Sequence, residues 1–297
     1  MIVLLFLVMG SHDFDSLYNA ATTLLVQFQE EQEAAFNTLI ELGQDPLYAD
    51  TTLAFLVDKF DTKSAIERHR LKDLFKEIGT SSVPSIVDRM DYRGSDEEDR
   101  HLKQSLWVLG EIGGSDIVPP VGQFIQDSSW QIRSGAFTAL GKSKSKIAHE
   151  FIVEGLYDTI ATVRKSAYYA LSQIIEEEDV PYLMQGLDDR FYGVRYAALQ
   201  GFIALDTSAI EPLVNLVLND DTRLFFAVQG LAELMAIDSF IITMIEASKP
   251  EIRLLIYESC NDLNVLQSLL EQEKEGILRA YLQRRIDSLY KESMYSM

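Results

Sequence analysis

Apolar residues in the middle of the chain follow the period of short helices that come in pairs. Between residues 148 and 156 the apolar side chains are spaced for one face of a helix. A second apolar face of helical spacing follows it, made of Val163, Ala167, Ala170, Leu171 and Ile174. The polar pair Asp158-Thr159 between the two faces is typical of a turn and of a helix start. The pattern therefore predicts two short amphipathic helices joined by a tight turn.

This two-helix pattern recurs with a period of about 31 residues. A β-branched residue followed by arginine occurs at spacings of 31, 31, 28 and 30 residues, at Ile132-Arg133, Val163-Arg164, Val194-Arg195, Thr222-Arg223 and Ile252-Arg253. An aspartate stands six residues before each of the first three arginines, and an alanine three residues after. A fixed period of this length is typical of a stacked helical array. We expect an all-α, right-handed α-solenoid (superhelix) of about seven two-helix repeats.

The repeat divides the chain into four stretches. The regular repeats extend over 64–262, because Gly79, Gly110 and Gly141 continue the 31-residue spacing towards the N-terminus. We expect Gly79 and Gly110 to end helices, and the insertion at residues 93–99 to be a solvated loop. Residues 12–63 and 263–297 are helical but off the pattern, as expected of N-terminal and C-terminal capping units. Residues 1–11 are a possible signal segment.

The first residues of the chain leave its location open between two readings. Residues 2–9 form a run of eight apolar side chains, IVLLFLVM, which is too short for the roughly 20 residues of a membrane span. We therefore expect no integral membrane span. The run fits the apolar part of a secretory signal, although the usual basic residue before it is missing. Export to a periplasm is our expectation; a cytoplasmic protein, with this segment packed on the first repeat, is the alternative.

The charge balance narrows the classes of partner. The net charge is −20, with 46 acidic and 26 basic side chains. Such a field repels phosphate backbones, so we expect no nucleic acid partner. A basic protein partner is more compatible, while simple solubility is the alternative reason for the acidity. The single cysteine, Cys260, excludes a disulfide framework and a cysteine-rich metal site.

The repeat resembles the HEAT-repeat family, and more closely its short phycobilisome-lyase-like branch. The resemblance rests on the 31-residue period and on six residues in three pairs: Asp127 and Arg133, Asp158 and Arg164, Asp189 and Arg195. It implies a structural ladder, in which each aspartate accepts turn N–H groups and an arginine reaches the aspartate of a neighbouring repeat. Arg223 has no aspartate six residues before it, so we expect an irregular ladder there.

The sequence offers no catalytic constellation. His149-Glu150 is the one His-Glu pair, whereas the related di-iron hydroxylases need several, so that activity is excluded. We find no phosphate-binding, Cys-x-x-Cys or nucleophile motif. We predict no cofactor, no metal site and no catalytic residue, with a weak Ca²⁺ site at 96–99 as an alternative.

Aromatic residues on the second helices are the candidate partner-binding residues. They are Trp107, Phe137, Tyr168 and Tyr169; further aromatics, Trp130, Phe191 and Tyr192, stand at the turns. Exposed aromatics anchor interfaces, while packing between repeats is the alternative role. We predict a non-catalytic protein-binding scaffold that uses the concave face of its repeats. The alternative, implied by the resemblance, is a chromophore-lyase-like protein that acts on a tetrapyrrole carrier.

Overall fold

The computed structural model describes residues 11–22, 29–95, 97–219, 222–234 and 249–295. The prediction of an all-α fold is confirmed, because these residues form 17 α-helices and no strand. The chain divides into two compact units, residues 1–174 and residues 175–297, which are described separately. The number of repeats and their handedness stay predictions. The proposed signal at 1–11 lies almost wholly outside the described residues, as does the first helix of the repeat at 238–262.

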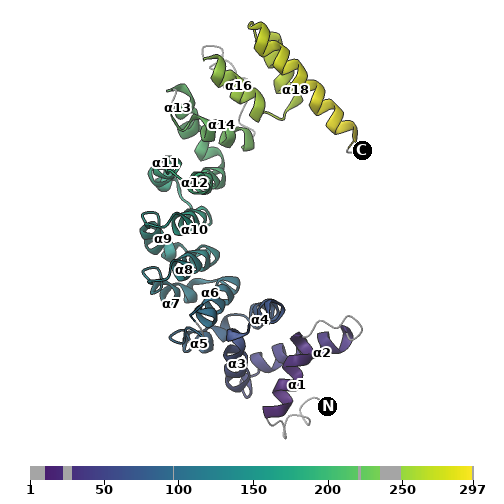
Figure 1. Ribbon diagram of the computed structural model, residues 1–297, viewed down its shortest axis with the longest axis vertical. Helices are drawn as coiled ribbons and strands as arrows, with labels where there is room; N and C mark the ends of the chain where they lie inside the picture. Colours follow the sequence, from purple (N-terminus) through teal and green to yellow (C-terminus); the bar gives the residue numbers. More distant parts are fainter. Residues whose placement is uncertain (1–10, 23–28, 96, 220–221, 235–248, 296–297) are drawn as a thin grey trace. The chain divides into compact units, whose positions relative to one another are not determined.

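Unit 1 is built from helical hairpins stacked in two layers. Its helices are α1 (Ser11–Thr22), α2 (Gln29–Gln44), α3 (Ala49–Asp58), α4 (Ala65–Ile78), α5 (Val83–Val87), α6 (Arg100–Ile112), α7 (Val118–Gly122), α8 (Trp130–Lys142), α9 (His149–Gly155) and α10 (Ala161–Ser172). The short helices α5, α7 and α9 form one layer, and α6, α8 and α10 form the other (Figure 1). The second helices pack on one another in sequence, from α2 through α4, α6 and α8 to α10.

Unit 2 continues the same construction. Its helices are α11 (Val180–Leu187), α12 (Tyr192–Ala204), α13 (Ile210–Leu218), α14 (Leu224–Glu233), α16 (Pro250–Ser259), α17 (Leu263–Gln272) and α18 (Gly276–Tyr295). The hairpins α11–α12, α13–α14 and α17–α18 each pack internally, and α12, α14, α16 and α18 pack in succession.

Proline and a short 3₁₀ turn begin the first helices of most repeats. Pro84, Pro119 and Pro181 stand in the first turn of α5, α7 and α11, where the missing N–H has no partner to lose. Each of these helices follows a three-residue 3₁₀ turn. The first helices are thereby started at fixed places by local sequence, independently of the packing around them.

The apolar stripe of the second helices forms the core, as the helical spacing predicts. In α8 and α10 the stripe consists of Ile132, Ala136 and Leu140, and of Val163, Ala167 and Leu171; all six are 0% exposed. Residues four apart lie on one face of a helix. Within unit 1, α8 packs on α7, α9 and α10, and α10 packs on α9 and α8. Burial of this stripe is the main apolar stabilisation of the array.

Two glycines of the 31-residue series lie inside helices rather than at their ends. Gly79 follows the last residue of α4, as expected, but α6 continues beyond Gly110 to Ile112. A Cβ on Gly110 would lie 3.0 Å from the Cα of Ala139, and one on Gly141 would lie 2.6 Å from the Cα of Ala170. The expectation that Gly110 ends a helix is therefore wrong. Glycine stands there because the backbone of the next helix passes too close for a side chain.

Two neighbouring glycines of α8 should consequently respond in opposite directions to alanine. Gly141→Ala should lower the free energy of unfolding by about 1–3 kcal/mol, because its Cβ overlaps the backbone of α10. Gly135→Ala should raise it by about 0.5–1 kcal/mol, because the nearest atom, Leu106 Cδ1, stands at 3.5 Å and alanine favours a helix. Urea unfolding followed by circular dichroism measures both. Equal midpoints would contradict the close packing of α8 on α10.

Candidate functional site

The ladder residues of unit 1 form a direct link between neighbouring repeats. Nε and Nη2 of Arg133 donate to the two carboxylate oxygens of Asp158 at 2.7 and 3.1 Å. Nη1 of Arg133 donates to the backbone oxygen of Asp127 at 2.8 Å. The side chains of Arg133 and Asp158 are 14% and 11% exposed. All three nitrogens of this guanidinium donate within the fold, so Arg133 holds the turns of two repeats together.

The aspartates of the ladder also fix the turns that precede the second helices. Oδ1 of each aspartate accepts the N–H two residues later at 2.8 Å, in the pairs Asp127–Ser129, Asp158–Ile160 and Asp189–Phe191. Nη1 of Arg164 and of Arg195 donates to the backbone oxygen six residues before it, at 2.7 and 2.6 Å. The six-residue spacing therefore has a local cause: the arginine folds back onto the turn that starts its own helix.

Arg93 supplies the ladder arginine that the sequence pattern lacks, from a loop in which Ser95, Glu97 and Glu98 are exposed as expected. Nη1 and Nη2 of Arg93 donate to the carboxylate of Asp127 at 2.6 and 3.1 Å, and Nε and Nη2 donate to that of Asp99 at 2.7 and 2.8 Å. The N–H of Ser95 donates to Asp61 at 2.8 Å. Sequence reasoning missed Arg93 because it stands six residues before an aspartate instead of six residues after one.

A glutamate continues the ladder geometry in unit 2. Nε of Arg253 donates to Glu273 Oε2 at 3.0 Å, and Nη2 donates to Glu275 Oε2 at 2.8 Å. Glu273 also accepts the hydroxyl of Tyr257 at 2.5 Å and the N–H of Glu275 at 2.8 Å. Arg279, six residues after Glu273, donates to its backbone oxygen at 3.3 Å. A search of the sequence for an arginine preceded at six residues by either Asp or Glu would have revealed this repeat.

The ladder changes direction at Arg223. Its Nη1 lies 3.4 Å from Asp188 Oδ2 and 4.0 Å from the sulfur of Met184, both in the preceding repeat. Arg133, in contrast, reaches forward to the following repeat. The missing aspartate before Arg223 is consistent with this reversal.

The buried ion pairs should make stability fall in acid. Hydrogen bonds from Arg93 hold the pKa values of Asp99 and Asp127 below their usual range. Burial raises the pKa of Asp158, but the bonds from Arg133 and the N–H of Ile160, together with the charges of Arg133 and Arg164, outweigh burial and leave that pKa lowered as well. A lowered folded pKa gives stability that is present above the unfolded value near 3.9 and lost as the pH falls through the folded value.

The expected outcome is a thermal midpoint that is flat from about pH 7 to 5 and falls steeply below about pH 4. An Asp158→Asn variant should melt below the wild type at pH 7, and the difference should shrink as the pH falls and Asp158 is protonated. Differential scanning calorimetry measures both proteins. A difference that grows in acid would contradict the assignment of the charge to Asp158.

Two of the four candidate partner-binding aromatics are core residues, so their expected exposure is wrong. Phe137 and Tyr168 are 1% and 2% exposed. The ring of Phe137 fills the space beside Gly155, where a Cβ would lie 2.3 Å from its Cζ. The same repeat position is occupied by Leu106 and Leu199, which are also buried. This position, adjacent to the apolar stripe, is buried in all four repeats, and at Phe137 the covering element is α9, the first helix of the next hairpin.

The position one residue later remains open in three successive repeats of unit 1. Trp107 is half-buried, Tyr169 is 37% exposed, and Thr138 between them is exposed. These three residues stand 31 residues apart on α6, α8 and α10. They define an open column on the second helices of unit 1, and Trp107 and Tyr169 are the candidates that the structure leaves accessible.

A shallow groove of about 250 Å³ runs between α6 and α8 beside this column. Lys103 and Trp107 of α6 line one wall, and Ser134, Thr138 and Lys142 of α8 line the other. Gly110, Gly135 and Ala139 also line it, and their small side chains leave the space open. We call this feature the lysine groove. Its lining contains no aspartate or glutamate.

A second pocket, of about 450 Å³, lies at the turns and belongs to the ladder. It is lined by Asp127, Arg133, Glu154, Tyr157 and Asp158 among others. The two aspartates and Arg133 already bind one another or the turns. This pocket is therefore accounted for by the structural role of the ladder.

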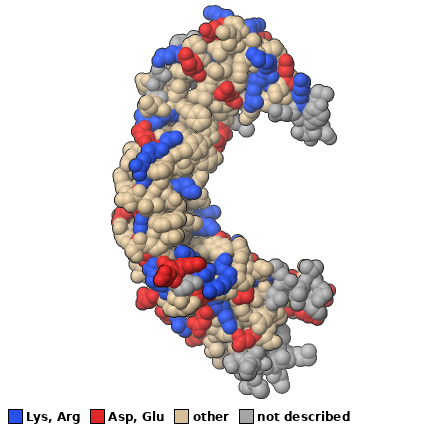
Figure 2. All heavy atoms as spheres, in the orientation of Figure 1, with Lys and Arg blue, Asp and Glu red and all other residues tan. Residues whose placement is uncertain are grey.

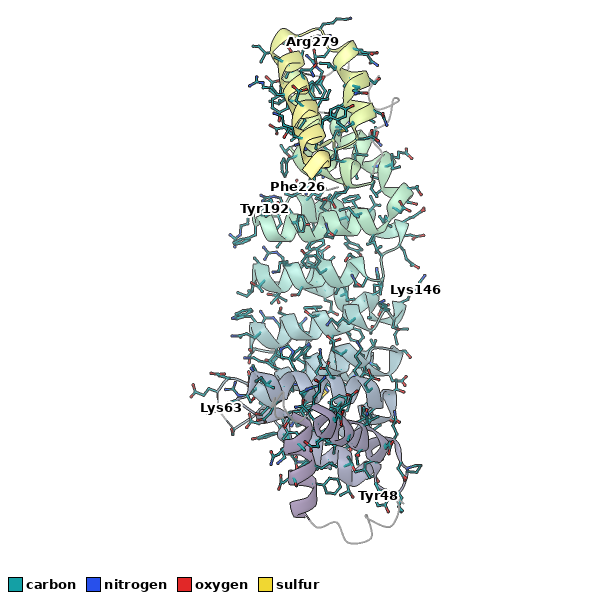
Figure 3. All side chains as sticks on the ribbon, turned by 90° about the vertical axis from the view of Figure 1, so that its right-hand side faces the viewer. Tyr48, Lys63, Lys146, Tyr192, Phe226 and Arg279 are labelled. Carbon is teal, nitrogen blue, oxygen red and sulfur yellow. The ribbon has the colours of Figure 1, made fainter. Side chains whose placement is uncertain are left out.

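The turn edges carry exposed aromatics in both units. In unit 1 Trp130 and Tyr157 are 42% and 56% exposed, and in unit 2 Phe191 and Tyr192 are 44% and 55% exposed. Figure 3 shows Tyr192 projecting at the edge of its unit. Its ring lies 5.7 Å from that of Phe226 (also labelled in Figure 3), so it is partly supported by packing. The turn edge is the competing surface for partner binding.

The described residues offer little metal or thiol chemistry. Within them, no group of three His, Cys, Asp or Glu side chains is placed to hold a metal ion. Cys260 is buried, and burial raises the pKa of its thiol. None of the described helices combines the length and the apolar character that crossing a membrane would need.

Comparison with known proteins identifies the repeats. Residues 88–172 match the family model for HEAT repeats, which confirms the HEAT-repeat prediction over α6 to α10. No curated protein matches the sequence. The family match covers the lysine groove and the first two complete ladder pairs.

Solved structures share the fold at low sequence identity. The chain is 15% identical to a chain of the Kap95:Nup1 complex with a TM-score of 0.52, and it covers 46% of that chain while 93% of its own length is matched. For yeast importin-beta (Kap95p) the identity is 14%, the TM-score is 0.50, and 88% of this chain and 42% of that chain are covered. For the complex of CpcE and CpcF of phycocyanin lyase from Nostoc the identity is 16% and the TM-score is 0.44, and the match covers 80% of this chain and 94% of that chain. The chain thus spans less than half the length of the importin chains, and these likenesses show the fold alone.

Proposed function

We propose that this protein is a non-catalytic scaffold that binds a protein partner on the second-helix face of unit 1. The observation that carries the proposal is the open column of α6, α8 and α10, where Trp107 and Tyr169 remain accessible beside the lysine groove. Half-buried aromatics beside a groove are typical anchors of protein interfaces. HEAT repeats stack so that such positions recur along one surface, which suits an extended partner.

The structure changes what we expect of the charge of the partner. The net charge of −20 predicts a basic partner for the molecule as a whole. Figure 2 shows Asp and Glu (red) interspersed with Lys and Arg (blue) rather than one continuous acidic surface. The lining of the lysine groove carries Lys103 and Lys142 and no acid. The charge that a partner meets therefore depends on which face it contacts.

The test is affinity capture from a lysate of the source organism, followed by mass spectrometry. A Trp107→Ser/Tyr169→Ser variant should lose its specific partner by about 30-fold or more, since two central anchors are worth about 2 kcal/mol or more. A Trp130→Ser/Tyr157→Ser variant at the turn edge is the matched control and should capture as the wild type does. The reverse result would place the interface at the turns. If the Trp107→Ser/Tyr169→Ser variant loses helicity, the two aromatic side chains serve the packing of the repeats rather than partner binding.

The lyase-like alternative stays a prediction from the family resemblance. A tetrapyrrole-carrying protein among the captured partners would favour it. The neighbouring genes in the source organism would test it independently.

A further inference from the structure

Lysines from three successive helices gather around the lysine groove. Lys103 and Lys142 line it. Lys72 of α4 places its Nζ 5.4 Å from the ring centroid of Trp107. The charge of Lys76 of α4 lowers the pKa of Glu111 of α6, and Glu111 in turn binds Lys142. This part of the surface is basic, although the chain as a whole is strongly acidic.

The acids in this region are outnumbered. Glu111 binds Lys142, and Lys72 binds Asp73 at 3.0 Å. Burial raises the pKa of Glu111, but the bond from Lys142 and the charges of Lys72 and Lys76 outweigh burial and leave that pKa lowered. A lowered pKa next to three lysines indicates a positive local field. Lys103 adds a further charge, and the carboxylate that it acts on, Asp99, is already bound by Arg93.

Trp107 gives the groove its apolar contact. It is half-buried between α4 and α8, and its ring meets that of His69 edge-on, with centroids 4.8 Å apart. The hydroxyl of Ser134 is paired with that of Ser166 at 2.8 Å, and that of Thr138 donates to the backbone of Ser134 at 2.9 Å. The polar wall is thus already satisfied by internal bonds. What the groove offers a ligand is positive charge and one aromatic surface.

These features fit a short acidic peptide better than a nucleic acid. Single strands are bound through a row of aromatic platforms and a continuous basic track, whereas this groove holds one tryptophan. The field of a chain of charge −20 also repels a long polyanion. A peptide with a few carboxylates experiences the local lysines without extending over the acidic remainder of the surface.

We propose that the lysine groove binds an acidic peptide segment of the partner protein, with carboxylates at Lys103 and Lys142 and an apolar side chain on Trp107. This inference rests on the proposed function and specifies the partner's chemistry. It also predicts binding that weakens as salt screens the lysines.

The test uses a displayed library of random twelve-residue peptides selected on the folded full-length protein. Selected peptides should be enriched in Asp and Glu beside an aromatic or large aliphatic residue. Fluorescence anisotropy with the best labelled peptide then measures affinity. Lys103→Glu/Lys142→Glu should weaken binding at least 10-fold, while Lys63→Glu/Lys146→Glu should stay within twofold of wild type. The two control lysines stand at opposite edges of unit 1 (Figure 3) and change the net charge equally.

A second variant guards against simple loss of folding. Gly135→Met fills the groove without changing the charge, and the space beside Gly135 is open, with its nearest neighbour at 3.5 Å. It should weaken the peptide at least fivefold while the helicity is kept. Equal binding by the wild type, the Lys103→Glu/Lys142→Glu variant and Gly135→Met would overturn the proposal. A 20-nucleotide oligo-dT that binds more tightly than the peptide would also overturn it, in favour of nucleic acid.

The outcome distinguishes this inference from the proposed function. Neutral or basic peptides that are lost with Trp107→Ser would overturn the acidic ligand and leave the second-helix interface standing. Peptides that are unaffected by Trp107→Ser would overturn both.

Discussion

Glu273→Ala should lower the free energy of unfolding of unit 2 by about 3–5 kcal/mol, the usual cost of removing one partner of a buried ion pair. The side chain of Glu273 is 3% exposed and accepts bonds from Arg253 and Tyr257. Its removal leaves the buried hydroxyl of Tyr257 without its carboxylate and takes one carboxylate from Arg253. Native-state hydrogen exchange of α16 and α18, followed by mass spectrometry, measures the change within unit 2.

Glu275→Ala is the matched control for this prediction. Glu275 also binds Arg253, but its side chain is 49% exposed, and an exposed ion pair contributes about 1 kcal/mol or less. Exchange in α16 and α18 should therefore rise far more in Glu273→Ala than in Glu275→Ala. Similar effects of the two substitutions would show that Glu273 has no special place in the packing of these helices.

Asp158→Ala should lower the free energy of unfolding of unit 1 by about 2–4 kcal/mol. It removes the forked bond of Arg133, whose two side chains are 14% and 11% exposed, and the acceptor of the N–H of Ile160. Asp116→Ala, at an exposed turn of the same unit, should change stability by less than about 0.5 kcal/mol. Urea unfolding followed by circular dichroism compares them. If Asp158→Ala unfolds at the same urea concentration as Asp116→Ala, the ladder does not stabilise the repeats.

The repeats could be predicted from the sequence, because a stacked array gives each repeat the same surroundings. Ile132, Ala136 and Leu140 are buried for the same reason as their counterparts one period later, so the period alone identifies the core. The starts of the first helices were equally predictable from proline in the first turn. Helix ends were less so: Gly110 looked like a helix end, but its role is set by the backbone of α8, which is distant in sequence.

The candidate site was only half predictable from sequence. Trp107 and Tyr169 lie in the open column, but Phe137 and Tyr168 are buried. An amphipathic pattern shows which face points to the hairpin partner and does not show which flank a neighbouring hairpin covers. Comparing whole columns at the period would have separated the two, since the position of Phe137 and Tyr168 is leucine in the flanking repeats.

Local charge could not be predicted because it depends on which helices become neighbours. Lys72, Lys103 and Lys142 are far apart in sequence, and Lys72 and Lys103 have acidic neighbours along the chain. The stacking of α4, α6 and α8 brings them to one groove. The net charge of a chain therefore does not determine the charge that one of its faces presents. Arg93 shows the same limit, because its partner Asp127 lies 34 residues away.

The most direct measurement of the central claim uses the two tryptophans of the chain as reporters. Trp130→Phe leaves Trp107 in the lysine groove, and Trp107→Phe leaves Trp130 at the turn edge. Each variant is titrated with a peptide selected on the wild type, and the tryptophan emission is recorded. The account predicts a saturable change in Trp130→Phe, with the same Kd as the anisotropy measurement, and no change in Trp107→Phe. A change in emission from Trp130 alone would contradict it and place the partner at the turns.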